Sequence, residues 1–284
     1  MYYYYINLDR VPDRAAFIED QFRQIGLSSQ LHRVSATDAL TMSPQPSYCP
    51  HRWGPRWELS QSEVACFTSH RRTWEMVIKA DLEHAVILED DVLLSQEMEA
   101  AVQDIVLRGP KDFDVIKLDG VPQIGRYGEA LPIGEARHVS EILQGMASAG
   151  CYLVSRRGAE WLLVNSISFC DHLDDFVFDP ASGRKIMQLQ SAVALQAMWS
   201  EQTGIEAMDY TVATSERTQD PLINRQIAKG PILYRLKKDL KRTGRKLART
   251  LYQDRSLIAS GGVIGAPQLA QDLGRYRSFR IAGT

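Results

Sequence analysis

Residues 84–94 read HAVILEDDVLL, and this stretch decides both the fold and the candidate site. The apolar run at 85–88 predicts a buried strand, which ends in the three carboxylates Glu89, Asp90 and Asp91. Adjacent negative charges repel one another, so stability alone does not account for the triplet. A divalent cation with oxygen ligands removes this repulsion and can also neutralise a diphosphate. The stretch therefore predicts either a site for a phosphate-bearing donor or a solvated acidic turn after a buried strand.

The composition is that of a soluble globular protein. The chain has 284 residues, of which 44% are hydrophobic and 24% charged, enough for one large domain or one domain with an appendage. No apolar run approaches the ~20 residues that span a bilayer, and residues 1–6 (MYYYYI) resemble a first strand rather than a signal segment. We therefore expect a cytoplasmic protein. The four cysteines form no Cys-x-x-Cys pair, so we expect reduced thiols rather than a zinc site.

Apolar segments of strand and helix periodicity alternate along the chain. Such alternation predicts an α/β layered fold with a mainly parallel sheet flanked by helices, in which ligands gather beyond the carboxyl ends of the strands. Residues 35–58 contain four prolines and two tryptophans and are expected to form a long loop that shapes acceptor choice. The expected strands are 2–7, 31–34, 84–89, 114–118 and 150–155, and the expected helices are 12–25, 60–78, 96–107 and 156–164.

Four further segments carry polar residues near these strand ends. They are INLDR at 6–10, followed by Arg14; SATDA at 35–39; LSQSEVACFTSH at 59–70; and DVIKLDG at 114–120. Each alone is explained as well by an ordinary feature, such as a capped turn or a helix with a buried, hydrogen-bonded histidine. Their significance lies in their order along the chain.

In this order the segments resemble glycosyltransferase family 25, which includes lipooligosaccharide and collagen galactosyltransferases. The resemblance also rests on LEDDV at 88–92 and on GCYLVSRRGA at 150–159. It is clear over about residues 2–165, weakens to about 225 and is then lost. The chain departs from the family where Ala39, Ser62 and Ala65 replace glycine. It also departs at FCDH (169–172), which only faintly matches a Pro-hydrophobic-Asp signature.

The resemblance implies a GT-A-like, Rossmann-like fold, a UDP-sugar donor, a divalent metal (Mn²⁺ or Mg²⁺) and inversion at the anomeric carbon. Clustered oxygen ligands suit these metals. By this resemblance Asp91 contacts the metal, and Glu89 is a second ligand or holds the donor ribose or sugar. The residues expected to bind the donor nucleotide and sugar are Asn7, Leu8, Arg10, Arg14, Ala36, Asp38, Ser69, Glu89 and Asp90.

Inversion in one displacement needs a base on the acceptor hydroxyl. A carboxylate or a histidine that faces the donor carbon could serve. For the later acidic group, a solvated loop is the alternative explanation. The candidate catalytic residues are Asp171, Asp174, Asp175, Asp119 and His70.

The net charge of −2 conceals a basic segment, because residues 231–250 contain eight Lys or Arg and one Asp. Leucines fall near one face of a helix there and basic residues surround the rest. Such a helix can lie on an anionic membrane surface, although a packed surface helix has the same pattern. We therefore predict a GT-A-like catalytic domain at 1–225 and a basic amphipathic helical extension at 226–284. No motif points to nucleic acid.

The predicted function is transfer of a hexose, expected to be galactose, from a UDP-sugar to a lipooligosaccharide or other glycan acceptor. The lipid-linked form of such an acceptor fits a peripheral location on the inner face of the membrane. One alternative is a metal-dependent phosphohydrolase or nucleotidyltransferase, although the chain lacks Gly-x-x-x-x-Gly-Lys-Ser/Thr and Asp-x-Asp-x-Thr patterns. The other is a non-catalytic module that binds a sugar nucleotide.

Overall fold

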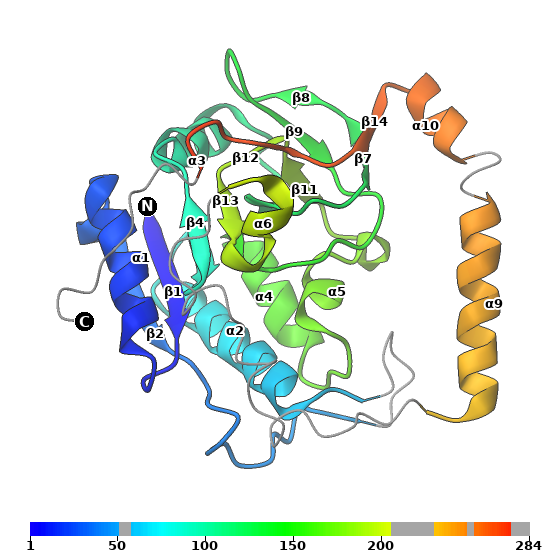
Figure 1. Cartoon of the computed structure of the whole chain (residues 1–284), viewed down its shortest axis with the longest axis horizontal. Helices are drawn as coiled ribbons and strands as arrows, with labels where there is room; N and C mark the ends of the chain where they lie inside the picture. Colours follow the sequence, from blue (N-terminus) through cyan, green and yellow to red (C-terminus); the bar gives the residue numbers. More distant parts are fainter. Residues whose placement is uncertain (51–57, 206–229, 249–252, 274–284) are drawn as a thin grey trace.

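An eight-stranded sheet forms the centre of the protein (Figure 1). The computed structural model describes residues 1–50, 58–205, 230–248 and 253–273. From one edge to the other, the strands are β2 (Leu31–Ser35), β1 (Tyr2–Asn7), β3 (His84–Glu89), β10 (Cys151–Ser155), β5 (Val115–Lys117), β11 (Ile186–Leu189), β9 (His138–Glu141) and β8 (Leu131–Pro132).

The sheet is mixed rather than mainly parallel. Strand β1 is parallel to β2 and β3, and β5 is parallel to β11, as expected for the predicted βα alternation. Strand β10, however, runs antiparallel between β3 and β5, and β9 is antiparallel to both β11 and β8. The apolar sequence of β10 did not reveal its direction, because a central strand buried on both faces has the same composition in either direction.

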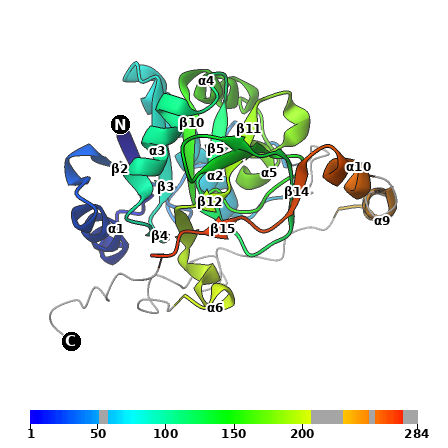
Figure 2. The ribbon, with the colours of Figure 1, turned by 90° about the horizontal axis from the view of Figure 1, so that it is seen from above.

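Both faces of the sheet are covered by helices, as predicted (Figure 2). Successive residues of a strand point to opposite faces, so Tyr3 and Tyr5 pack on one side while Tyr4 and Ile6 pack on the other. The first side is covered by α1 (Pro12–Gln24) and α3 (Met98–Arg108), and the second by α2 (Gln61–Lys79), α4 (Arg156–Asn165) and α5 (Leu173–Val177). The four longer helices lie where the sequence predicts helices.

The ends of α1 and α2 follow from local sequence. Ser60 and Glu63 form a capping box, in which the Ser60 side chain accepts from the Glu63 backbone and the Glu63 carboxylate accepts from Ser60 N at 2.8 Å. Gly26 adopts φ +77° just after α1, a conformation that side-chain-bearing residues avoid. Gly26 thus ends α1, and the capping box fixes where α2 begins, next to the carboxyl ends of β1 and β3.

A second, three-stranded sheet brings a distant segment to the acidic turn. It consists of β4 (Val92–Leu94), β13 (Ala194–Gln196) and β6 (Asp119–Gly120), in that order with β13 in the middle. Gln196 pairs with Val92, and Ala197 N donates to the Asp91 carbonyl oxygen at 2.7 Å. The side chain of Gln196 is thereby held beside the turn that follows β3.

Three short helices lie between these elements: Ser28–Gln30, Pro180–Ser182 and Ala197–Trp199, the last of which leads into α6 (Ser200–Thr203).

The end of the chain contains the predicted basic helix, α9 (Ile232–Ala248), followed by α10 (Asp254–Ala259). It then returns to the body, where β14 (Gly262–Gly265) pairs with β7 (Gly125–Glu129) and β15 (Gln268–Leu269) pairs with β12 (Ser191–Ala192). The predicted domain boundary near residue 225 lies outside the described residues. None of the helices in the described part of the chain has both the length and the hydrophobicity needed to cross a bilayer.

Candidate active site

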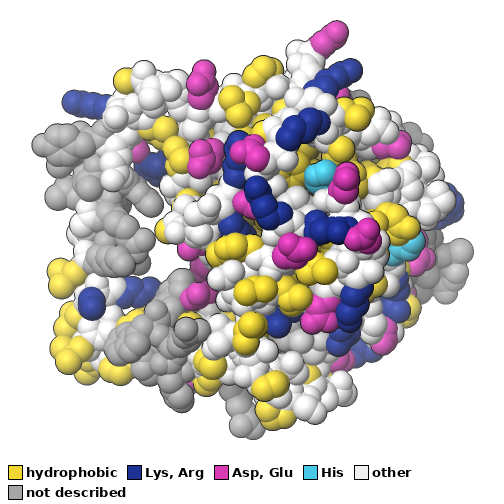
Figure 3. Space-filling model, turned by 180° about the vertical axis from the view of Figure 1, so that it is seen from behind, with side chains coloured by type: hydrophobic (Ala, Val, Ile, Leu, Met, Phe, Trp, Pro, Cys, Tyr) yellow, Lys and Arg dark blue, Asp and Glu magenta, His cyan; other side chains and the backbone are white. Residues whose placement is uncertain are grey.

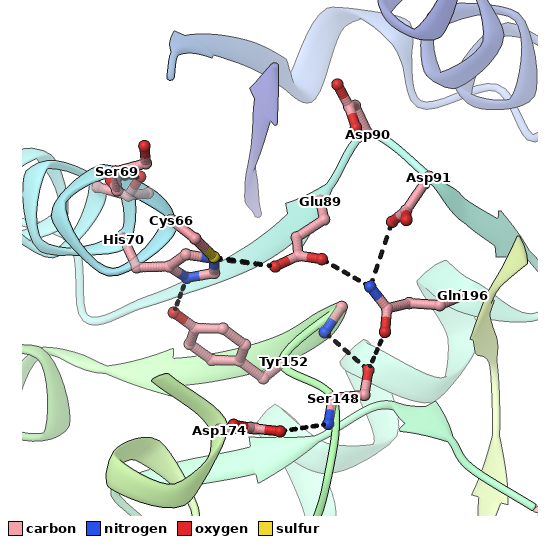
Figure 4. A network of polar contacts seen from close by, with 12 residues as sticks. Cys66, Ser69, His70, Glu89, Asp90, Asp91, Ser148, Tyr152, Asp174 and Gln196 are labelled. Atoms are coloured by element: carbon pink, nitrogen blue, oxygen red, sulfur yellow. Dashed lines mark hydrogen bonds and ion pairs between the residues drawn. The ribbon is translucent and has the colours of Figure 1, made fainter. Parts of the chain in front are cut away.

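The three consecutive carboxylates point in different directions (Figure 4). Glu89 is the last residue of β3, and Asp90 and Asp91 form the turn that leads into β4. Figure 4 shows Glu89 and Asp91 directed toward Gln196, with Asp90 directed away from this network. One acidic triplet therefore serves two different sets of contacts.

Asp90 is held by two side chains from the first strand–helix unit. Asn7 Nδ2 donates to Asp90 Oδ2 at 2.7 Å, and Arg14 Nη1 donates to Oδ1 at 3.1 Å. Asp90 and Arg14 are both buried, and burial raises the pKa of Asp90 although Arg14 and Asn7 oppose the rise. Both carboxylate oxygens of Asp90 are thus used to fix the acidic turn against β1 and α1.

Glu89 and Asp91 converge on one nitrogen atom. Gln196 Nε2 lies 2.6 Å from Glu89 Oε2 and 3.3 Å from Asp91 Oδ1. Two carboxylates that reach the same donor can also reach a single cation, because oxygen ligands surround Mg²⁺ or Mn²⁺ at similar distances. The pair therefore fits the divalent metal that the sequence predicts.

Burial and the nearby charge of Glu89 raise the pKa of Asp91 from 3.8 to about 7. Between these values the folded protein retains a proton that the unfolded chain has already released. The free energy of unfolding then falls as the pH rises, because the native state binds more protons than the unfolded state.

We expect the metal-free protein to lose stability as the pH is raised from about 4 to about 7, by up to ~1.4 kcal/mol per pH unit from this group, and to level off above that range. Asp91→Asn should flatten this dependence because the substituted side chain does not titrate. Denaturation in urea at several pH values, in the presence of EDTA, measures both slopes. Identical slopes for the two proteins would contradict the assignment.

A buried network holds Gln196 in place. Ser148 Oγ lies 2.7 Å from Gln196 Oε1 and 2.5 Å from Asp119 Oδ2, and Lys117 Nζ lies 2.7 Å from Asp119 Oδ1. Lys117 and Asp119 are completely buried, so each charge depends on the other. A side chain at Gly150 would place its Cβ 2.5 Å from Gln196 Cγ, which explains the glycine there.

On its other side Glu89 meets the helix α2. Cys66 Sγ lies 3.6 Å from Glu89 Oε1, and His70 Nε2 lies 3.5 Å from the same oxygen. The ligand atoms of these three residues all lie within 4.8 Å of one another, close enough to hold a metal ion. His70 Nδ1 is 2.8 Å from the Tyr152 hydroxyl, which fixes the ring. Cys66, His70 and Glu89 thus form a second group that could hold a metal ion, on the Oε1 side of Glu89.

Two cavities meet at Glu89 and Asp91. The first has a volume of about 170 Å³ and lies between the ends of β1 and β3 and the start of α2. The second has a volume of about 520 Å³ and lies between α2, α5 and the segment after β13. The residues Cys66, Glu89 and Asp91 line both cavities. The acidic pair therefore forms the wall between them.

The second cavity contains a short polar cluster from the start of α5. His172 Nε2 lies 2.7 Å from Glu63 Oε1, so the glutamate that caps α2 also holds this histidine. His172 Nδ1 lies 3.6 Å from Asp174 Oδ1, and Ser148 N donates to Asp174 Oδ2 at 3.2 Å. Through Ser148, Asp174 is connected to Gln196 and the acidic pair.

The structure brings most of the predicted site residues to these cavities. The predicted residues that line the first are Leu8, Arg10, Arg14, Ala36, Ser69, His70, Glu89, Asp90 and Asp91. Asp38 lies behind this lining, where it pairs with Arg10 at 2.7 Å, and Asn7 lies behind Asp90. Asp174 and Asp175 line the second cavity, whereas Asp171 and Asp119 line neither.

Sequence reasoning missed Gln196, Ser148 and the Glu63–His172 pair. Gln196 ends the apolar run 192–195 in the same way as Glu89 ends its strand, so its position offered a signal. Ser148, Glu63 and His172 gave no sequence signal of a role in the site, because their partners there are distant in sequence.

The sequence profile described as "Glycosyltransferase family 25 (LPS biosynthesis protein)" matches residues 1–177. This range includes β1, the acidic turn, α2 and the whole of α5. The chain belongs to glycosyltransferase family 25. Gln196 and the basic helix α9 lie beyond the part that matches this family.

Curated relatives carry the same family name. The chain is 32% identical over 95 residues to a Drosophila pseudoobscura pseudoobscura "Glycosyltransferase 25 family member", and 29% identical over 126 residues to one from Drosophila melanogaster. A Mus musculus protein named "Inactive glycosyltransferase 25 family member 3" is 28% identical over 180 residues. The matches cover 31%, 37% and 56% of this chain and 15%, 20% and 28% of the relatives, so the chain spans less than a third of their length.

Proposed function

We propose that this family 25 protein is an inverting, metal-dependent glycosyltransferase that moves a hexose, expected to be galactose, from a UDP-sugar to a lipooligosaccharide or another glycan. The observation that carries the proposal is the pair of cavities that meet at Glu89 and Asp91. A transferase needs separate places for donor and acceptor, with the reacting carbon where they meet.

The first cavity fits the donor. It lies beyond the carboxyl ends of the parallel strands β1 and β3, the usual ligand position in α/β sheets and the one that a GT-A-like fold requires. Arg10 and Arg14 on its wall supply positive charge for a diphosphate. Asp38 and Asp90 hold these two guanidinium groups in place.

Glu89 and Asp91 are the residues we propose as metal ligands, since they converge on one point and repel each other without a counter-charge. A bound Mn²⁺ or Mg²⁺ supplies the charge that stabilises the departing diphosphate. Gln196 keeps the two carboxylates together and ties them to the second cavity.

The second cavity fits the acceptor, and we propose Asp174 as the base. In the reaction the acceptor oxygen forms a bond to the anomeric carbon while the bond from that carbon to the UDP oxygen breaks. The hydroxyl proton passes to the carboxylate of Asp174, and UDP leaves with the electron pair of the broken bond. The hydrogen bond from Ser148 N and the nearby His172 ring orient this carboxylate.

The test is to incubate the protein with Mn²⁺, individual UDP-sugars and lipooligosaccharide-type saccharides, and then to analyse the products. Equal amounts of UDP and extended saccharide are expected. Release of inorganic phosphate, or of pyrophosphate with transfer of a nucleotide, would instead indicate a phosphohydrolase or a nucleotidyltransferase.

A sugar-nucleotide-binding module remains the second candidate, because one relative is named inactive. It would bind UDP-sugars in calorimetry and yield neither UDP nor extended saccharide with any acceptor. Retention of the acidic pair, and of a second cavity that such a module does not need, favours the enzyme.

A further inference from the structure

Helix α9 carries an apolar stripe that the rest of the described protein does not cover. Ile232, Leu233, Leu236 and Leu240 are 71%, 80%, 54% and 74% exposed. At 3.6 residues per turn these four side chains fall within an arc of about 100°. Figure 3 shows apolar side chains gathered at the lower left edge of the molecule, where α9 begins, with basic side chains next to them. Burial in the protein core therefore does not explain this stripe.

A different face of the helix carries its buried residue. Tyr234 is the buried residue among the described side chains of α9, with 8% exposure. Burial raises its pKa, and the charges of Cys170 and Asp171 add to the rise, so Tyr234 lies near the segment just before α5. Tyr234 lies about 140° around the helix from the centre of the apolar stripe. The apolar stripe and the buried Tyr234 thus lie on opposite sides of the helix.

Basic residues flank the stripe. Arg235 and Lys237 are exposed and fall about 60° and about 40° beyond its two edges. The whole segment 231–250 contains eight basic residues and one acidic residue. A helix with apolar residues on one side and cations beside them matches an anionic bilayer, whose headgroups attract the cations while the leucines enter the acyl boundary. Two of the required features, exposure and charge, are thus present together.

We propose that α9 docks the protein on an anionic lipid bilayer, with the helix axis parallel to the surface and the leucines inserted. The docking also bears on the acceptor, and this step rests on the proposed function. Tyr234 lies near Cys170 and Asp171, and the next residues, His172–Asp175, line the acceptor cavity. A docked α9 would hold this cavity near the membrane, where a lipid-linked saccharide is presented.

The experiment is sedimentation of the full chain with phosphatidylcholine vesicles prepared with and without phosphatidylglycerol. Binding is expected to the anionic vesicles, to weaken as salt is added, and to be minor without phosphatidylglycerol. The combined variant Leu233→Ser, Leu236→Ser, Leu240→Ser should bind about tenfold more weakly or worse. The matched control replaces three exposed apolar residues elsewhere, Leu107→Ser, Val164→Ser and Ile167→Ser (70%, 63% and 67% exposed), and should bind within about twofold of wild type.

Failure of wild type to bind the anionic vesicles, or unchanged binding by the α9 variant, would overturn the proposal. Self-association that depends on the three leucines, without vesicle binding, would assign the stripe to a second copy of the chain. Release of UDP in solution reports separately on the proposed function, because the leucines lie outside both cavities. The α9 variant should release UDP as wild type does while its binding to anionic vesicles is weakened.

Discussion

Replacing Asp91 by Asn is expected to lower turnover of the UDP-sugar by about a thousandfold. Asp91 lies at the wall between the two cavities and reaches the same point as Glu89. Asn keeps the shape of the side chain and removes the negative charge that a divalent cation needs. The departing diphosphate would then lack its counter-charge at the moment the glycosidic bond to UDP breaks.

Steady-state release of UDP in the presence of Mn²⁺ measures this effect. Asp81→Asn is the matched control, since Asp81 lies on the surface, where its carboxylate pairs with Arg156 at 2.5 Å and is 87% exposed. That variant should retain the activity of wild type. If Asp91→Asn retained more than about a tenth of the wild-type activity, Asp91 would not be a metal ligand.

Replacing Asp174 by Asn is expected to lower transfer to the acceptor by about a hundred- to ten-thousandfold while the affinity for UDP stays unchanged. The amide cannot take the proton of the acceptor hydroxyl. Asp174 lies in the second cavity, so its loss should leave the donor cavity intact.

Asp175→Asn is the informative comparison, because Asp175 is adjacent and lines the same cavity. It is expected to lower transfer by about tenfold or less, through weaker acceptor binding. Initial transfer rates at saturating donor, with calorimetry of UDP binding to each variant, distinguish the two residues. A larger loss for Asp175→Asn than for Asp174→Asn would transfer the role of base to Asp175.

The layered fold follows from local patterns that the sequence displays openly. The run at 85–88 is apolar without alternation because β3 is packed on both faces, and the capping residues Ser60 and Glu63 locate α2. The direction of β10 and the pairing of β14 with β7 could not be predicted in this way. Both depend on contacts between distant segments, which leave no periodic signal in either segment.

In the candidate site, too, local sequence predicted some features and contacts between distant segments determined the others. The acidic triplet at the end of a strand predicted the site, yet its sequence did not indicate that Asp90 faces Arg14 while its neighbours face Gln196. Arg14 of α1 orients Asp90, and Gln196 of β13 orients the other two carboxylates. Gln196 lies 107 positions after Glu89, and only the small sheet with β4 brings them together.

The central claim is that Glu89 and Asp91 hold a divalent cation at the junction of the donor and acceptor cavities. Calorimetric titration of UDP, with Mn²⁺ and again with EDTA, tests it most directly. The account predicts that Mn²⁺ tightens UDP binding by about tenfold or more, that UDP tightens Mn²⁺ binding by the same factor, and that Asp91→Asn abolishes this coupling. Equal affinity for UDP with and without the metal, or coupling that survives in Asp91→Asn, would contradict it.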